Sequence, residues 1–113
     1  MRRVFGQVGR LKPEMIDEYR RLHREAVHGP QWAGVLETIR RCHLEDYAIF
    51  LLGDVVFSYF VYTGDDYEAD MAAMAADPVT QAWWTHTHPC FAQYDPRWPE
   101  PFYVDMEQIF RMD

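Results

Sequence analysis

Two neighbouring apolar segments constrain the fold of this 113-residue chain more than any other feature of its sequence. The segments "YAIFLL" (47–52) and "VVFSYFVYT" (55–63) are rich in β-branched and aromatic residues, and Gly53-Asp54 separates them. This pattern predicts a β-hairpin with a two-residue turn. Because the second segment is apolar at nearly every position, we expect both faces of its strand to be covered. Helices can cover one face, and a second copy of the chain is the simplest cover for the other.

The rest of the chain predicts further strands and helices within one domain, residues 1–113. Residues 3–11 predict a first strand, and 103–112 a last strand in which apolar and polar residues alternate. Four further segments predict helices: 15–27, 32–42, 65–76 and 77–88. In the first two, apolar residues recur at spacings of three and four, and the third is rich in alanine. Asp77 is expected to cap the last helix, with Pro78 in its first position.

The resulting order, β-α-β-β-α-β with additional helices, is the ferredoxin-like split βαβ pattern. We therefore expect an α+β fold, in which helices cover one face of an antiparallel sheet. The open face is expected to close against a second copy, which gives a homodimer with a dimeric α/β barrel.

Charge and composition exclude several classes of protein. The net charge of −7 argues against a nucleic-acid partner and against an anionic membrane surface. The opening residues contain no apolar h-region, and no apolar run reaches the length of a membrane span. Cys42 and Cys90 have neither zinc-site spacing nor the pattern of a disulfide framework. We expect a cytoplasmic protein that makes no contact with membranes or nucleic acids.

A tyrosine and a histidine lie one helical turn apart in "DEYRRLHRE" (17–25). Tyr19 and His23 would project from the same face of the predicted helix. An imidazole transfers protons near neutral pH, because its ordinary pKa is about 6.5. The alternative is that the pair only packs, with the tyrosine at the edge of the core and the histidine half exposed.

Trp83-Trp84 and Tyr47 are the other candidate binding residues. Adjacent helical positions point about 100° apart, so both indoles cannot face one buried stripe. One of them is expected at an edge, in a pocket or at an interface, although core packing alone would also explain the pair. Tyr47 begins the predicted second strand, where its side chain could reach the rim of the sheet.

The sequence contains no motif for a metal or a cofactor. His86 and His88 are two positions apart and diverge on a helix, which disfavours a shared metal ion. H-E-x-x-H, G-x-S-x-G and glycine-rich phosphate loops are absent from the sequence. We therefore expect neither a metal nor a cofactor.

Four stretches together resemble the L-rhamnose mutarotase family: "EYRRLHREAV", "DYAIFL", "GDDYEADMAAMAADPVTQAWW" and "MEQIFRMD". The resemblance implies a homodimeric α/β enzyme, without metal or cofactor, that interconverts the α and β anomers of a 6-deoxy-hexose pyranose such as L-rhamnose. It also implies that His23 is the general acid. The residues matching the family's substrate-binding positions are Tyr19, Tyr47, Trp83 and Trp84.

Two segments depart from the family pattern. "HGPQ" (28–31) is interposed after "HREAV", which is expected to reshape the wall beside His23, and the loop 91–102 has no match that we can assign. Two alternatives remain at this point. One is a non-catalytic sugar-binding or accessory subunit. The other is a different enzyme on the dimeric ferredoxin-like fold, such as a small monooxygenase or cyclase.

Overall fold

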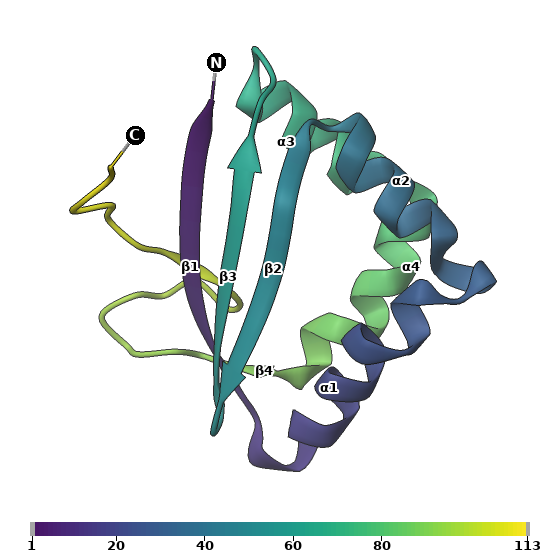
Figure 1. Ribbon diagram of the computed structural model, residues 1–113. Helices are drawn as coiled ribbons and strands as arrows, with labels where there is room; N and C mark the ends of the chain where they lie inside the picture. Colours follow the sequence, from purple (N-terminus) through teal and green to yellow (C-terminus); the bar gives the residue numbers. More distant parts are fainter. Residues whose placement is uncertain (1, 113) are drawn as a thin grey trace.

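A single antiparallel sheet forms one layer of the protein (Figure 1). The computed structural model describes residues 2–112. The sheet has the order β2-β3-β1-β4, and a fifth short strand also pairs with β1. Its strands are β1 (Arg3–Leu11), β2 (Leu44–Leu52), β3 (Val55–Tyr62), β4 (Phe91–Ala92) and β5 (Val104–Asp105). The predicted hairpin is confirmed, since β2 and β3 pair across a turn at Gly53-Asp54.

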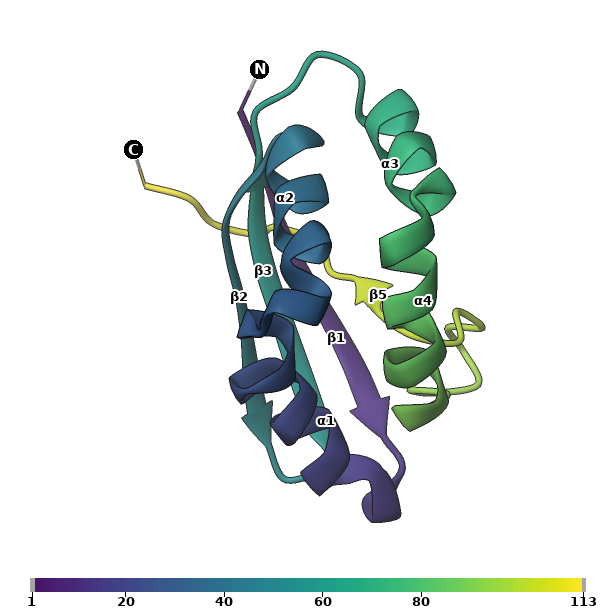
Figure 2. The ribbon, with the colours of Figure 1, turned by 90° about the vertical axis from the view of Figure 1, so that its right-hand side faces the viewer.

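Four helices cover one face of this sheet, and the other face carries none (Figures 1 and 2). They are α1 (Ile16–Arg24), α2 (Ala33–Arg41), α3 (Tyr67–Ala76) and α4 (Pro78–Thr87). Short 3-10 turns flank them, and those at Ala26–His28 and Pro30–Trp32 form the break between α1 and α2. The predicted α+β fold is therefore confirmed. No helix in the described residues is long and apolar enough to span a membrane.

The predicted cap of α4 is also confirmed. The Asp77 carboxylate accepts a hydrogen bond from the Thr80 backbone N–H at 2.9 Å, and Pro78 occupies the first helical turn. The α3 helix begins in the same way, because the Asp66 carboxylate accepts from the Ala69 N–H at 3.1 Å. Each carboxylate satisfies a backbone donor that the helix itself leaves without a partner.

A β-bulge interrupts β2 near its start. Glu45 lies opposite Val61, but Ala48 lies opposite Tyr59, so β2 has one residue more than β3 between these pairs. Asp46 adopts a φ of 51°, a left-handed conformation that accommodates the extra residue. As a result the Tyr47 ring lies on the helix-covered side, 5.3 Å from the Phe60 ring between centroids. The strand also begins at Leu44, three residues earlier than predicted.

The space between sheet and helices contains two apolar clusters. The larger one surrounds Val56 on β3 and includes Leu11, Leu22 and Trp83. The smaller one surrounds Phe60 on the same strand and includes Leu44 and Tyr62. These clusters lie at opposite ends of the sheet, because Val56 and Phe60 are four residues apart on one strand.

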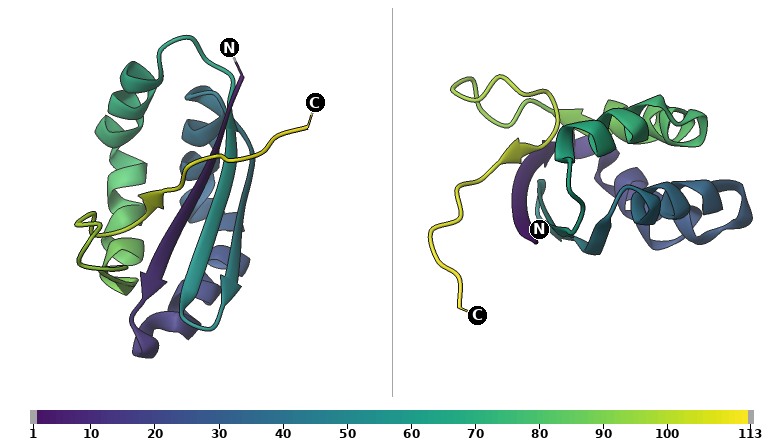
Figure 3. Two further views of the ribbon diagram at one scale, coloured as in Figure 1. Left: turned by 90° about the vertical axis from the view of Figure 1, so that its left-hand side faces the viewer. Right: turned by 90° about the horizontal axis from the view of Figure 1, so that it is seen from above.

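The prediction of a last strand over 103–112 is wrong beyond Asp105. The Met106 N–H still donates to the Gly6 carbonyl at 2.8 Å, and the chain then leaves β1 on the side away from the helices (Figure 3). Ile109, Phe110 and Met112 are exposed. An alternating pattern forms a strand only where a neighbouring strand and a covering layer are available, and neither lies beside this tail in one copy of the chain.

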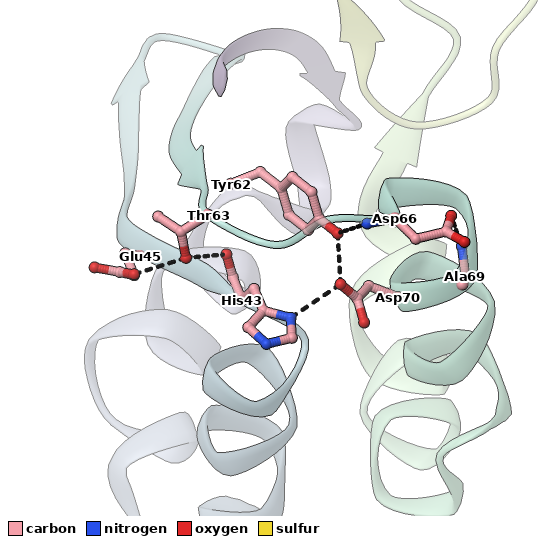
Figure 4. A network of polar contacts seen from close by, with 7 residues as sticks. All are labelled: His43, Glu45, Tyr62, Thr63, Asp66, Ala69 and Asp70. Atoms are coloured by element: carbon pink, nitrogen blue, oxygen red, sulfur yellow. Dashed lines mark hydrogen bonds and ion pairs between the residues drawn. The ribbon is translucent and has the colours of Figure 1, made fainter. Parts of the chain in front are cut away.

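A polar network attaches α3 to the sheet at the end remote from the hairpin turn (Figure 4). The buried Tyr62 hydroxyl donates to the Asp70 carboxylate at 2.5 Å and accepts from the Asp66 N–H at 3.1 Å. His43 Nδ1 lies 2.9 Å from the same oxygen of Asp70. Burial, and then the hydrogen bond to Asp70, raises the pKa of Tyr62 to about 12. These contacts connect the smaller apolar cluster to α3.

Candidate active site

Tyr19 and His23 share one face of α1, as predicted, and their ring centroids are 4.2 Å apart. His23 Nδ1 lies 2.8 Å from the Tyr19 backbone carbonyl oxygen. A carbonyl oxygen only accepts hydrogen bonds, so Nδ1 must carry the proton in this contact. In the neutral imidazole Nε2 then holds the free lone pair, which is the form that accepts a proton.

Burial sets the charge of His23. Burial disfavours the imidazolium and lowers the pKa of His23 from its ordinary 6.5, while the hydrogen bond to the Tyr19 carbonyl acts in the opposite direction. The neutral form therefore predominates near pH 7. A neutral, oriented imidazole is suited to proton transfer.

A groove of about 430 Å³ lies between α1 and the β2–β3 hairpin. Tyr19 and His23 form its helical side, with Arg20 and Arg24 beside them. The remaining lining residues come from the hairpin: Ile49, Phe50, Leu51, Leu52, Gly53 and Val56. The volume lies within the range of small-molecule sites, and a mostly apolar lining with a few polar groups is typical of them.

Two further phenols stand close to Tyr19. The Tyr19 and Tyr103 hydroxyls are 2.9 Å apart and share a hydrogen bond. Burial raises the pKa of both phenols, so both remain protonated in the neutral range. Burial also raises the pKa of Tyr47, and a hydrogen-bonding interaction with Ser58 acts in the opposite direction. The Tyr47 hydroxyl also raises the pKa values of Tyr19 and Tyr103, as a lesser cause than burial.

The two adjacent tryptophans occupy different surroundings, as predicted from the angle of about 100° between adjacent helical positions. Trp83 is only 5% exposed and packs edge-on against the rings of Trp32 and His23, at 5.1 and 5.7 Å between centroids. Trp84 is half-buried and stacks on His88 at 5.2 Å. With His88 it lines a second, shallower hollow of about 400 Å³. The structure thus brings Tyr19, His23 and Trp83 together, and it places the Trp84 ring against His88.

The interposed segment 28–31 lies in the break between α1 and α2. It leads into Trp32, whose buried ring contacts Trp83 and also His86. Sequence reasoning missed Tyr103 because it follows the unmatched loop, where no motif marks it. Within residues 2–112, no group of three His, Cys, Asp or Glu side chains is arranged to hold a metal ion.

A helix-covered antiparallel sheet, with an oriented histidine on the first helix beside a groove of small-molecule size, defines a small α+β protein with a candidate ligand site. Comparison with known proteins identifies the family within this structural class. The chain belongs to the L-rhamnose mutarotase family, whose profile matches residues 4–112. Proteins of this family are isomerases that act on carbohydrates.

Named relatives support this assignment. The L-rhamnose mutarotase of Brucella anthropi is 30% identical over 103 residues, which cover 91% of this chain and 90% of the relative. That of Opitutus terrae is 31% identical over 98 residues, or 85% of each chain. That of Burkholderia ambifaria is 34% identical over 74 residues, which cover 66% of this chain and 65% of the relative.

Solved structures share the fold at lower identity. An L-rhamnose mutarotase from Formosa agariphila superposes with a TM-score of 0.71 at 17% identity, covering 98% of this chain and 99% of that one. A NIPSNAP family protein from Agrobacterium tumefaciens gives a TM-score of 0.59 at 18% identity, covering 82% and 86%. At these identities the superpositions establish the fold alone.

Proposed function

We propose that this chain interconverts the α and β anomers of L-rhamnose, with His23 as the acid–base group. The observation that carries the proposal is the hydrogen bond from His23 Nδ1 to the Tyr19 carbonyl, in a member of this family. It leaves Nε2 as the nitrogen available to a ligand in the groove. No other histidine in residues 2–112 lines that groove.

The reaction needs one proton to leave the anomeric hydroxyl and one to reach the ring oxygen. Neutral His23 takes the hydroxyl proton at Nε2, and the electrons of that O–H bond form the C1 carbonyl. The C1–O5 bond breaks with its electron pair on the ring oxygen, which receives the proton from Nε2. His23 is then neutral again, and it has acted as the general acid in the second half of the step. Rotation about C1–C2 and reversal of the sequence give the other anomer.

Tyr19, Tyr47, Trp83 and Trp84 are the proposed binding residues. The protonated phenols donate hydrogen bonds to sugar hydroxyls, which their raised pKa values favour over ionisation. Indole faces cover the apolar patches of a sugar, including its 6-methyl group. Such contacts stabilise the bound sugar in the ground state and the transition state alike.

We also propose that the protein is a homodimer that pairs through the uncovered face of the sheet. Phe50 and Leu52, which alternate with the inward residues of β2, are 61% and 84% exposed. The tail beyond Asp105 runs on that same side of the sheet (Figure 3). Its residues Ile109, Phe110 and Met112 are exposed. Apolar surface gathered in this way is characteristic of an interface.

Anomer exchange of L-rhamnose, measured by saturation-transfer NMR, tests the activity. His23→Ala should reduce the enzymatic exchange rate by roughly 10²–10⁴-fold, the usual contribution of a positioned acid–base group. His28→Ala, which removes an exposed histidine on the 3-10 turn Ala26–His28, is the matched control and should leave the rate unchanged. Rhamnose binding without exchange in the wild-type protein would instead identify an accessory sugar-binding subunit. A His23→Ala variant with wild-type exchange would remove His23 from the mechanism.

A further inference from the structure

A band of polar side chains crosses the middle of the helix-covered sheet face, between the two apolar clusters. Ser58 lies on β3, two residues from Val56 of the larger cluster and two from Phe60 of the smaller one. On β1 its partner in register is Gln7, whose own partner on β5 is Asp105. On β2, the bulge turns Tyr47 to this same face. The centre of a two-layer core is ordinarily its most apolar part.

Part of this band is internally satisfied. Gln7 Nε2 donates to the Asp105 carboxylate at 2.7 Å, so each of these side chains already has a partner. Four hydroxyl groups remain, which we call the hydroxyl cluster: Tyr19, Tyr47, Ser58 and Tyr103. Three of them are phenols whose pKa values burial raises. The cluster is therefore neutral and rich in O–H donors.

The hydroxyl cluster makes too few hydrogen bonds for its burial. Ser58 has no exposed surface, and its Oγ is the one buried side-chain polar atom in residues 2–112 that makes no hydrogen bond of good geometry, although the Tyr47 hydroxyl lies close enough to interact with it. Tyr19 and Tyr103 share a single hydrogen bond, so one of their two protons is not used in it. Buried polar groups in proteins are nearly always hydrogen-bonded, and exceptions often mark functional sites.

We propose that Ser58 and Tyr103 are further sugar-binding residues, whose hydroxyls bind secondary ring hydroxyls of the substrate and determine which sugar is accepted. The inference rests on the proposed function, since it assigns the hydroxyl cluster to the same sugar that His23 acts on. Pyranose hydroxyls both donate and accept, and they complement a neutral cluster of donors better than an ion would. Tyr103 also fixes the Tyr19 phenol one helical turn from His23.

Access to Ser58 requires a neighbouring side chain to move. Tyr47 is the neighbour suited to do so, because it sits on the bulge and is 39% exposed. Its hydroxyl would then bind the sugar beside Ser58. The cluster accordingly joins two residues that the family resemblance implies with two that it does not.

The test compares wild type, Ser58→Ala and Tyr103→Phe in anomer exchange of L-rhamnose and of its 2-, 3- and 4-deoxy analogues. Each variant should raise KM for L-rhamnose by about 2- to 10-fold, the worth of one hydrogen bond, with kcat nearly unchanged. For the analogue that lacks the contacted hydroxyl, the KM difference between wild type and variant should disappear. Ser58→Ala should also raise the melting temperature, because it removes a buried hydroxyl that makes no hydrogen bond of good geometry.

Thr38→Val is the matched control, since Thr38 is a buried hydroxyl residue on α2 outside the band. It should leave KM unchanged for every sugar. If wild type exchanges L-rhamnose but both variants keep the wild-type KM for all sugars, the inference is overturned and the proposed function stands. If wild type exchanges no sugar, the proposed function fails. Calorimetric binding of L-rhamnose to the same variants then still decides the role of Ser58, and Ser58→Cys replaces Ser58→Ala if the latter does not fold.

Discussion

At the scale of single residues, the Tyr19 carbonyl determines which nitrogen of His23 remains available for other contacts. The backbone of α1 holds this carbonyl one turn before the imidazole, so the orientation of the ring follows from helical geometry. Burial then keeps the imidazole neutral near pH 7. Side-chain orientation and charge state are thus fixed by two different causes, and each can be tested separately.

The charge state predicts how anomer exchange depends on pH. Because burial lowers the pKa of His23, the enzymatic kcat/KM should be constant above pH 6.5 and fall at an inflection below 6.5. Protein stability should depend on pH in the same direction as the activity. As pH falls, the unfolded histidine binds its proton before the folded one does. The stability that His23 contributes above pH 6.5 is therefore lost as pH falls from 6.5 through the lower folded-state pKa. Exchange measured by NMR from about pH 5 to 8 checks this, with His23→Ala as background. Exchange that increases below pH 6.5 would mean that the imidazolium is the active form.

The two tryptophans should separate stability from binding. Trp83→Ala removes a buried ring from the larger apolar cluster and should lower the free energy of unfolding by about 3–5 kcal/mol. Trp84→Ala removes a half-buried ring, so the loss of stability should be smaller. If its indole stacks on the sugar, KM rises while kcat is retained. Thermal melts and exchange kinetics of both variants provide the measurements. An unchanged KM for Trp84→Ala would exclude Trp84 from the sugar site.

At the scale of elements, the predictions from sequence succeeded where a pattern is local. The α1 and α2 helices follow from apolar spacing, α3 follows from its alanine-rich composition, and the start of α4 follows from Asp77-Pro78. The pairing of Tyr19 with His23 needs only helical geometry. The bulge at Asp46-Tyr47 could not be predicted, because it depends on the register with β3.

Two members of the hydroxyl cluster were missed for similar reasons. Ser58 is the one small polar residue within "VVFSYFVY", which is a signal that can be recognised once the inward face of the strand is known. Tyr103 reaches Tyr19 across 84 positions of sequence, and no local pattern predicts such a contact. The tail beyond Asp105 was assigned to a strand from its alternation alone, without a neighbour to pair with.

The network around Tyr62 should anchor α3 independently of the active site. Tyr62→Phe removes the hydroxyl that joins Asp70 to the Asp66 backbone, and we expect the melting temperature to fall by several degrees. Anomer exchange below that temperature should stay at the wild-type rate, because the network lies at the opposite end of the sheet. Tyr59→Phe, on the other face of the same strand, is the matched control for loss of a phenol hydroxyl. Equal melting temperatures for the two variants would contradict an anchoring role.

At the scale of the whole molecule, one face of the sheet has no helices and carries exposed apolar side chains. We predict a homodimer at micromolar concentration, with more than ~1,000 Å² buried between its sheets. Phe50→Glu should shift the protein toward monomer in sedimentation velocity experiments, because it places a charge within that interface. Trp98→Glu makes a comparable change on an exposed loop residue and should leave the dimer intact. A monomeric wild type would refute the predicted assembly.

The bulge in β2 also affects how this protein tolerates changes in the length of its gene. Side chains alternate between the two faces of a strand, so loss of one codon at Asp46 would restore regular pairing with β3 and leave Ala48 and every later residue of β2 opposite its present partner. Tyr47 would then lie directly opposite Phe60, and Ile49 and Leu51 would keep their places beside the groove. The extra residue thus absorbs a deletion that, within the regularly paired segment 48–52, would transfer part of the strand wall of this pocket to the opposite face.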